Sequence, residues 1–156
     1  MALNLIVVAD STTLIALSNI NKLDLLKHFS QKIAIPKAVF NEVFGDKNIS
    51  CDSSFIEVVD IQNISLADGL RLKLDKGESE AITLAIELNA PLIIDEKKGR
   101  AFAKELGVKT IGLVGILAIF RRKDILGVNE LRELIESLKC VNFWITEGLE
   151  RFIFEA

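Results

Sequence analysis

The chain has 156 residues, of which 50% are hydrophobic and 26% are charged, and its formal net charge is −3. This size predicts a single domain over residues 1–156 with a substantial core, and the charged content argues against a disordered chain or a membrane protein. The acidic balance excludes a nucleic-acid binder that works by bulk positive charge, but it leaves room for local basic clusters.

Short apolar runs alternate with helical patterns along the whole chain. The first half predicts, in chain order, a strand at 5–9, a helix through 14–20, a short helix at 22–29, a strand at 32–35, a helix from Pro36 to near Gly45, a loop at 45–54, a strand at 55–61 and a helix that starts at a Ser65–Asp68 capping box and runs toward Leu74. The second half predicts a helix from Gly77 to Leu88, a strand at 91–94, a helix at 99–106, a short strand at 109–111 and helices at 113–123, 128–139 and 144–154. This alternation is typical of an α/β fold, a three-layer α/β/α sandwich with a central, mainly parallel sheet.

Acidic residues follow two of the predicted strands. The run LIVVA ends at Asp10, and PLII ends at Asp95. A carboxylate in such a place is costly to bury unless something pairs with it, and ligands of parallel α/β sheets bind beyond the carboxyl ends of the strands. Two predicted helices add Glu42 and Glu78. Three or four carboxylates without a histidine form a hard oxygen donor set that suits magnesium or manganese.

Each of these acids also has a purely structural interpretation. Asp10 and Asp95 could each cap the helix that follows, since Asp is a favoured N-cap residue. Glu42 could be an exposed helix charge, and Glu78 could be the far half of an Asp75-x-x-Glu78 capping box. The lone histidine, His28, lies on an amphipathic helix, where a structural role is expected.

Two basic clusters stand out, Lys97-Lys98-Gly99-Arg100 and Arg121-Arg122-Lys123. Each could be a solvated helix face or a local site for phosphate groups.

Three stretches occur in a specific order, VADSTTLIAL, IAIPKAVFNEV and DKGESEAITLAIELNAPLIIDEKKGRAFAKELGVKTIGLVGIL, followed by a helical tail. Together they resemble a PIN domain, the nuclease fold of the VapC-type toxins, and they are most similar to a PIN subfamily of prokaryotic proteins. The resemblance spans nearly the whole chain, and it implies one PIN-like domain.

Carried over by position, the resemblance implies a set of four acids: Asp10, Glu42, Glu78 and Asp95. Many relatives have Asp at the third position, so the longer Glu78 could reach a metal through water. For the fourth acid, the spacing of the toxins favours Glu96, whereas the strand end and the DExxGR pattern of closer relatives favour Asp95, which we prefer. Thr12 matches the hydroxyl residue that orients the first carboxylate in the family.

The resemblance implies an Mg²⁺- or Mn²⁺-dependent endoribonuclease that hydrolyses RNA phosphodiester bonds and could be the toxin of a toxin–antitoxin pair. Asp10, Glu78 and Asp95 would hold the metal. Glu42 would complete the shell or position the water. Contacts to the substrate would come from Thr12, Lys97, Lys98 and Arg100.

The expected partners are RNA and an antitoxin protein. Single-stranded RNA is favoured over a duplex, because a concave acidic site must receive one bent strand; structured RNA remains open. A catalytically inactive PIN scaffold that binds RNA or a protein is the alternative. A Rossmann-like cofactor binder is disfavoured, because no Gly-x-Gly-x-x-Gly follows the first strand.

We expect a cytoplasmic protein without membrane contact. No apolar run reaches the roughly 18 to 20 residues of a membrane span, and the first run lacks the basic flank of a signal peptide. Cys51 and Cys140 lie far apart without metal-ligand spacing, which predicts reduced thiols.

The apolar surplus predicts a homodimer. Trp144, Phe152 and Ile153 lie in the last predicted helix, where a single core would not absorb them all. The alternative is that the late helices close the monomer's own core. No aromatic stacking platform for RNA is apparent, because tyrosine is absent and the nine Phe and one Trp are interpreted as core or interface.

Overall fold

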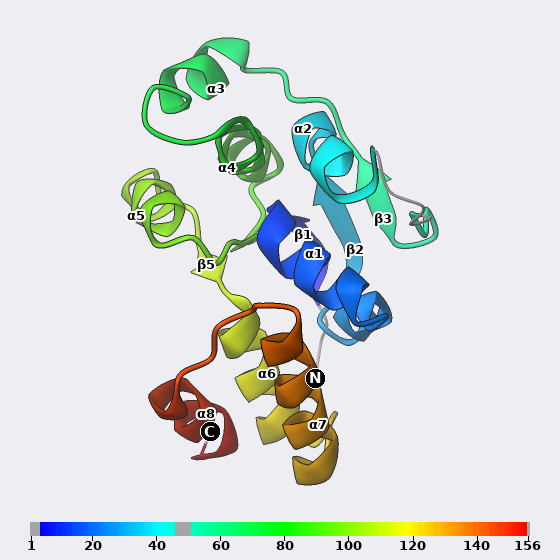
Figure 1. Ribbon diagram of the computed structural model, residues 1–156. Helices are drawn as coiled ribbons and strands as arrows, with labels where there is room; N and C mark the ends of the chain where they lie inside the picture. Colours follow the sequence, from blue (N-terminus) through cyan, green and yellow to red (C-terminus); the bar gives the residue numbers. More distant parts are fainter. Residues whose placement is uncertain (1–3, 46–50, 156) are drawn as a thin grey trace.

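The computed structural model describes residues 4–45 and 51–155 (Figure 1). Its described strands form one sheet in the order β3-β2-β1-β4-β5, and every neighbouring pair is parallel. The strands are β1 (Asn4–Ala9), β2 (Ser30–Ile35), β3 (Ile56–Val58), β4 (Leu92–Ile93) and β5 (Thr110–Ile111). The expected α/β fold with a parallel sheet between helices is confirmed.

Helices connect and cover the strands. In Figure 1, α3, α4 and α5 lie at the top of the view and α6, α7 and α8 at the bottom. The helices are α1 (Ser11–Asn19), the 3₁₀-helix η1 (Leu23–His28), α2 (Lys37–Phe40), the π-helical turn η2 (Asn41–Gly45), α3 (Ile64–Leu70), α4 (Lys76–Leu88), α5 (Lys97–Glu105), α6 (Leu113–Arg122), α7 (Val128–Cys140) and α8 (Glu147–Glu155). Within the described residues, none of these helices has the length and apolar character that a membrane crossing needs.

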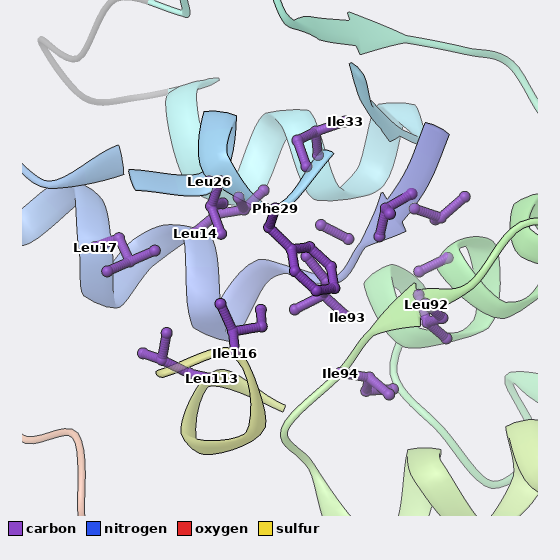
Figure 2. Close-up of a cluster of buried hydrophobic side chains, with 14 of the residues drawn as sticks. Leu14, Leu17, Leu26, Phe29, Ile33, Leu92, Ile93, Ile94, Leu113 and Ile116 are labelled. Carbon is purple, nitrogen blue, oxygen red and sulfur yellow. The ribbon is translucent and has the colours of Figure 1, made fainter. Parts of the chain in front are cut away.

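The central strand β1 is buried on both faces. Residues 7–9 are inaccessible to solvent, which explains why the strand reads as an unbroken apolar run instead of an alternating one. Figure 2 shows that Leu14 and Leu17 of α1 and Leu113 and Ile116 of α6 contribute to one cluster beside the sheet. The N-terminal strand and a late helix therefore share one core.

The strand order reverses between β1 and β4. The chain runs from β1 outward to β2 and β3, and then returns to place β4 and β5 on the other side of β1. In an open parallel sheet, such a reversal leaves a crevice beyond the carboxyl ends of the two strands. Asp10 follows β1 directly and its N–H donates to the carbonyl of Ile93 in β4 at 2.8 Å. The strand-end acids therefore stand at this crevice.

Two predicted helix starts are wrong by a few residues. The helix expected from Ser65 begins at Ile64, because the side chain of Asn63 accepts a hydrogen bond from the N–H of Leu66 at 3.1 Å and caps it. The last helix begins at Glu147 instead of Trp144. Thr146 Oγ1 accepts from the N–H of Leu149 at 3.2 Å, so the chain before Thr146, including Trp144, is not helical.

Two further segments differ in detail from the expectation. The helix expected at 22–29 is a 3₁₀-helix, and the helix after Pro36 continues past Phe40 as a π-helical turn. Residues 46–50 of the predicted loop lie outside the described residues. His28 is exposed, with its ring edge-on to Phe120, as its structural interpretation predicts. Both cysteines are free.

Replacing Leu14 with Ala tests the shared core. Leu14 is fully buried in the cluster of Figure 2, and removing such a side chain costs about 2 to 5 kcal/mol of the free energy of unfolding. The matched control is Leu72→Ala, because Leu72 is 83% exposed and its loss should change that free energy by less than about 0.5 kcal/mol. Equal denaturant midpoints for the two variants would contradict this packing.

Candidate active site

Asp10 is a buried carboxylate at the start of α1. It occupies the N-cap position without a side-chain capping hydrogen bond, although the backbone N–H of Ser11 lies close enough to the carboxylate to lower the pKa of Asp10 in part. Asp10 is only 3% exposed to solvent. Burial raises the pKa of Asp10 to about 7, and the nearby negative charges of Asp75, Glu42 and Asp95 add to this. The helix cap is therefore an insufficient reason for a carboxylate here.

Glu42 reaches the same region from the π-helical turn η2. Its Oε2 accepts a hydrogen bond from Ser11 Oγ at 2.8 Å, which ties η2 to the first residue of α1. The backbone of Gly77, at the start of α4, approaches the Glu42 carboxylate so closely that a Cβ at this position would collide with Oε1. Glu42 is exposed at the residue level, but its carboxylate points toward α1 and α4 and not away from the protein.

Glu78 has two roles at once. With Asp75 it forms the capping box of α4, in which the Glu78 N–H donates to Asp75 Oδ1 at 2.8 Å and the Asp75 N–H donates to Glu78 Oε1 at 3.2 Å. The capping interpretation is therefore confirmed. The residue is also only 7% exposed, and burial raises the pKa of Glu78 to about 7, with the charges of Asp75 and Asp10 adding to the shift. A capping carboxylate need not be buried beside another acid.

Asp95 lies between β4 and α5 and is held from two sides. Thr13 Oγ1 of α1 donates to Asp95 Oδ2, and the N–H of Leu113, the first residue of α6, donates to Asp95 Oδ1 at 2.8 Å. The cap of α5 is Glu96, whose Oε2 accepts from the N–H of Gly99 at 2.6 Å. The suggestion that Asp95 caps α5 is therefore wrong. Glu96 is also close to the site, because its carboxylate lies beside that of Glu78 over Gly99, so the choice of Asp95 over Glu96 as the fourth acid stays a prediction.

The hydroxyl residues that contact the acids are Ser11 and Thr13. Both are buried and hydrogen-bonded to carboxylates, whereas Thr12 is exposed and lines a cavity with Asp95. Sequence reasoning singled out Thr12 and missed its two neighbours. Helical spacing could have indicated that Ser11 is buried, because it lies three residues before Leu14 and therefore on the same, buried face of α1.

The donor chemistry of the site fits a hard divalent cation. Burial raises the pKa of Asp10, and none of the ion pairs among the described residues includes Asp10, Glu78 or Asp95. Carboxylate oxygens are the ligands that Mg²⁺ and Mn²⁺ prefer. In their present positions, the described side chains include no group of three or more acids, cysteines or histidines arranged to hold a metal ion. The acids thus share one region without forming a closed coordination shell.

Positive charge lies next to these acids. Lys97, Lys98 and Arg100 are exposed on the first turn of α5. A Cβ on Gly112 would lie 2.8 Å from Asp95 Oδ1 and 3.3 Å from Arg100 Nη1, so the carboxylate and the guanidinium both lie beside this glycine. None of the ion pairs within the described residues includes Arg100, which leaves it available for an anionic ligand.

The second basic cluster, Arg121–Lys123, stands elsewhere. Arg121 is near the end of α6, roughly 12 Å along the axis from Leu113 by helix geometry, and it pairs with Asp124 at 3.5 Å. Arg122 and Lys123 are exposed, as a solvated helix face would be, whereas Nε of Arg121 is buried and has no hydrogen-bond partner among the described residues.

One cavity adjoins the acids. It has a volume of about 620 Å³ and its lining includes Thr12, Asp95 and Arg100. Another cavity of about 380 Å³ lies around Pro91, at the opposite end of β4, and its lining includes no acid. The larger cavity therefore has one of the four acids, Asp95, in its lining.

Replacing Asp10 with Asn should stabilise the protein in the absence of metal. The pKa of Asp10 in the folded state, about 7, lies above its ordinary value of 3.8, so the folded state binds more protons than the unfolded state between these pH values. The free energy of unfolding of the parent therefore falls as pH rises from about 4 to about 7. Thermal melts in a chelator should show Asp10→Asn with the higher Tm at pH 8 and a shrinking difference toward pH 4.

The same melts with Mn²⁺ provide the control. The cation should raise the Tm of the parent more than that of the variant, because ligands that bind only the folded state stabilise it. A lower Tm for Asp10→Asn at pH 8 without metal would contradict the buried, uncompensated charge.

Comparisons with known proteins agree with this architecture. The PIN domain family model (DUF3368) matches residues 6–155. Among solved structures, a PilT N-terminus domain protein from the hyperthermophilic archaeon Sulfolobus solfataricus P2 is similar at 27% identity and a TM-score of 0.45, over 69% of this chain and 87% of that chain. No curated protein matches at a significant level. The match over residues 6–155 shows that the chain belongs to the PIN-domain family and has its nuclease-type fold.

Proposed function

We propose that the protein is a divalent-metal-dependent endoribonuclease that hydrolyses the phosphodiester bonds of single-stranded RNA. The observation that carries this proposal is the buried Asp10 carboxylate at the reversal of strand order, with the charges of Glu42 and Asp95 close enough to raise its pKa further. PIN domains are generally nucleases, and a crowded set of carboxylates is the donor set that a phosphoryl-transfer metal site requires.

The acids divide the work according to their surroundings. Asp10, Glu78 and Asp95 are the ligands we assign to Mg²⁺ or Mn²⁺. When bound, such a cation supplies Lewis acidity to the phosphate and lowers the pKa of a coordinated water. Asp95 is oriented by Thr13 and the backbone of α6. Glu42, held by Ser11, is the carboxylate we assign to positioning the attacking water.

The substrate backbone is assigned to the basic start of α5. Lys97, Lys98 and Arg100 are exposed there, and phosphate contacts of this kind position a strand without reading its sequence. A single strand fits better than a duplex, because the acids lie within a crevice between helix ends and must receive one bent backbone.

Action as the toxin of a toxin–antitoxin pair is part of the same proposal. A toxin of this kind would need an antitoxin protein that blocks RNA cleavage, and a small DNA-binding protein encoded next to this chain would support it. The expected homodimer also stays a prediction. Of the three side chains that suggested it, Ile153 lies in the monomer core, whereas Trp144 and Phe152 are exposed.

Replacing Asp95 with Asn tests the nuclease directly. We expect Mn²⁺-dependent cleavage of a single-stranded RNA to fall by about 100-fold or more, since a metal ligand is lost, while the Tm without metal stays at or above that of the parent. Glu105→Gln is the matched control, because Glu105 is an exposed acid at the far end of α5, and it should leave cleavage near the parent rate. Glu96→Gln tests the competing assignment.

Two results would count against this assignment. Loss of cleavage in Glu96→Gln with retention in Asp95→Asn would make Glu96 the fourth acid. A parent protein that binds RNA but cleaves none with Mn²⁺ or Mg²⁺ would favour the inactive scaffold.

Thr13 and Thr12 can be separated by a pair of isosteric substitutions. Thr13→Val removes the hydroxyl that orients Asp95, and lost partners of metal ligands typically weaken metal affinity by about 10- to 100-fold. Thr12→Val should leave the Mn²⁺ affinity unchanged, because Thr12 is exposed. The measurement is the Mn²⁺ concentration for half-maximal cleavage. A shift in Thr12→Val alone would restore the role that the sequence suggested.

A further inference from the structure

Trp144 leaves a large aromatic ring in solvent. It is the only tryptophan of the chain and is 86% exposed, although burying such a ring is strongly favourable. The backbone around it is well anchored. The N–H of Phe143 donates to the carbonyl of Leu138 at 2.9 Å, and Ile145 is buried. Trp144 is therefore presented at the surface from a fixed segment between α7 and α8.

This ring faces the cavity that adjoins the acidic site. The lining of the cavity of about 620 Å³ includes Asp95 and Arg100 as well as the aromatic residues Phe143, Trp144 and Phe152. Figure 1 shows the α7–α8 connection passing the beginning of α6, the helix whose first N–H holds Asp95. Cavities of roughly 300 to 1,000 Å³ accept small ligands, so one nucleotide fits this volume.

The charged and aromatic side chains that line the cavity favour a particular kind of ligand. Arg100 lies at the wall without an ion pair among the described residues, and Asp95 lies beside it. An apolar protein surface placed here would bury both charges, which is costly. A nucleotide instead offers a phosphate for the guanidinium and a flat ring for the aromatic side chains, and Asn142 adds an amide that can hydrogen-bond to a base edge.

We propose that this cavity is a nucleobase pocket, in which an unpaired base stacks on Trp144 while the adjacent phosphate lies at Arg100, next to Asp95. The inference rests on the proposed nucleic-acid substrate and names the path of the strand beside the acids. It requires a single strand, because bases in a duplex are already stacked on each other. The proposal departs from the expectation that the chain lacks an aromatic stacking platform, because Trp144 is exposed and does not belong to the core.

The position of Trp144 makes its fluorescence a direct probe, because no other tryptophan contributes. The experiment uses the full chain with Asp10→Asn in a chelator, so that no cleavage occurs and the repulsion of phosphates is reduced. A short single-stranded RNA should quench the fluorescence saturably. The same backbone with abasic positions should bind more weakly and quench less. Single-stranded DNA of the same sequence distinguishes a general nucleobase pocket from one that requires the 2′-hydroxyl.

Substitutions in the same background measure the contribution of the ring. Trp144→Ser should raise the Kd for a labelled RNA by roughly 5- to 100-fold, as expected for one lost stacking contact, and Trp144→Phe should retain part of the affinity. Leu72→Ser is the matched control, because Leu72 is likewise exposed but does not line the cavity, and it should leave Kd unchanged. Equal Tm values would show that the variants are folded.

Several results would overturn the pocket. The first is RNA binding without a change in Trp144 fluorescence. The second is an abasic strand that binds as tightly as the RNA, and the third is a Kd of Trp144→Ser equal to that of the parent. If light scattering showed that Trp144→Ser converts a dimer into a monomer without a change in RNA affinity, the surface around Trp144 would be an interface between copies of the chain. Cleavage of RNA by Trp144→Ser with the parent KM would remove the pocket and leave the nuclease intact. Trp144-dependent binding by a parent that cleaves nothing would remove the nuclease and leave the pocket.

Discussion

The structure depends on one costly placement, the carboxylate of Asp10 at the end of the central strand. β1 is buried on both faces and is followed at once by α1, so the side chain at position 10 is only 3% exposed. Burial and the neighbouring acids raise its pKa to about 7, which means that the folded chain holds this group at a cost unless a cation compensates it. This unfavourable burial occurs at the position where a parallel α/β sheet binds its ligands.

Helix ends surround the acids and moderate their repulsion. α1, α4, α5 and α6 all begin at this edge, next to Asp10, the Asp75–Glu78 capping box, Glu96 and the Asp95 contact to Leu113, respectively. The N-terminus of a helix carries a partial positive charge and free N–H groups, so it favours nearby carboxylates and phosphates. The helix ends offset part of the repulsion between these acids, although burial still raises the pKa of Asp10 and of Glu78 to about 7. This arrangement also explains why a capping role and a metal-binding role are compatible in Glu78, rather than exclusive alternatives.

Much of this architecture could be predicted from the sequence. Apolar runs that end at Asp10 and Asp95 indicated parallel strands with acids at one edge, because side chains after adjacent parallel strands meet there. Side-chain partners could not be predicted as well. The orientation of α1 relative to η2 and β4 determines which hydroxyl of Ser11-Thr12-Thr13 contacts a carboxylate. Trp144 lies outside α8 because the cap at Thr146 places the start of that helix at Glu147. Both depend on tertiary packing or on a single hydrogen bond, and hydrophobic periodicity carries little information about either.

We infer that the buried carboxylates form a cation site. Calorimetric titration of the metal-free protein with Mn²⁺ at pH 7, in two buffers of different ionisation enthalpy, tests this inference. Burial raises the pKa of both Asp10 and Glu78 to about 7, so part of each is protonated before the metal binds. Because carboxylate ligands must be deprotonated, we expect saturable binding of Mn²⁺ that is accompanied by the release of protons. Saturable binding without proton release, or no binding heat at millimolar Mn²⁺, would contradict it.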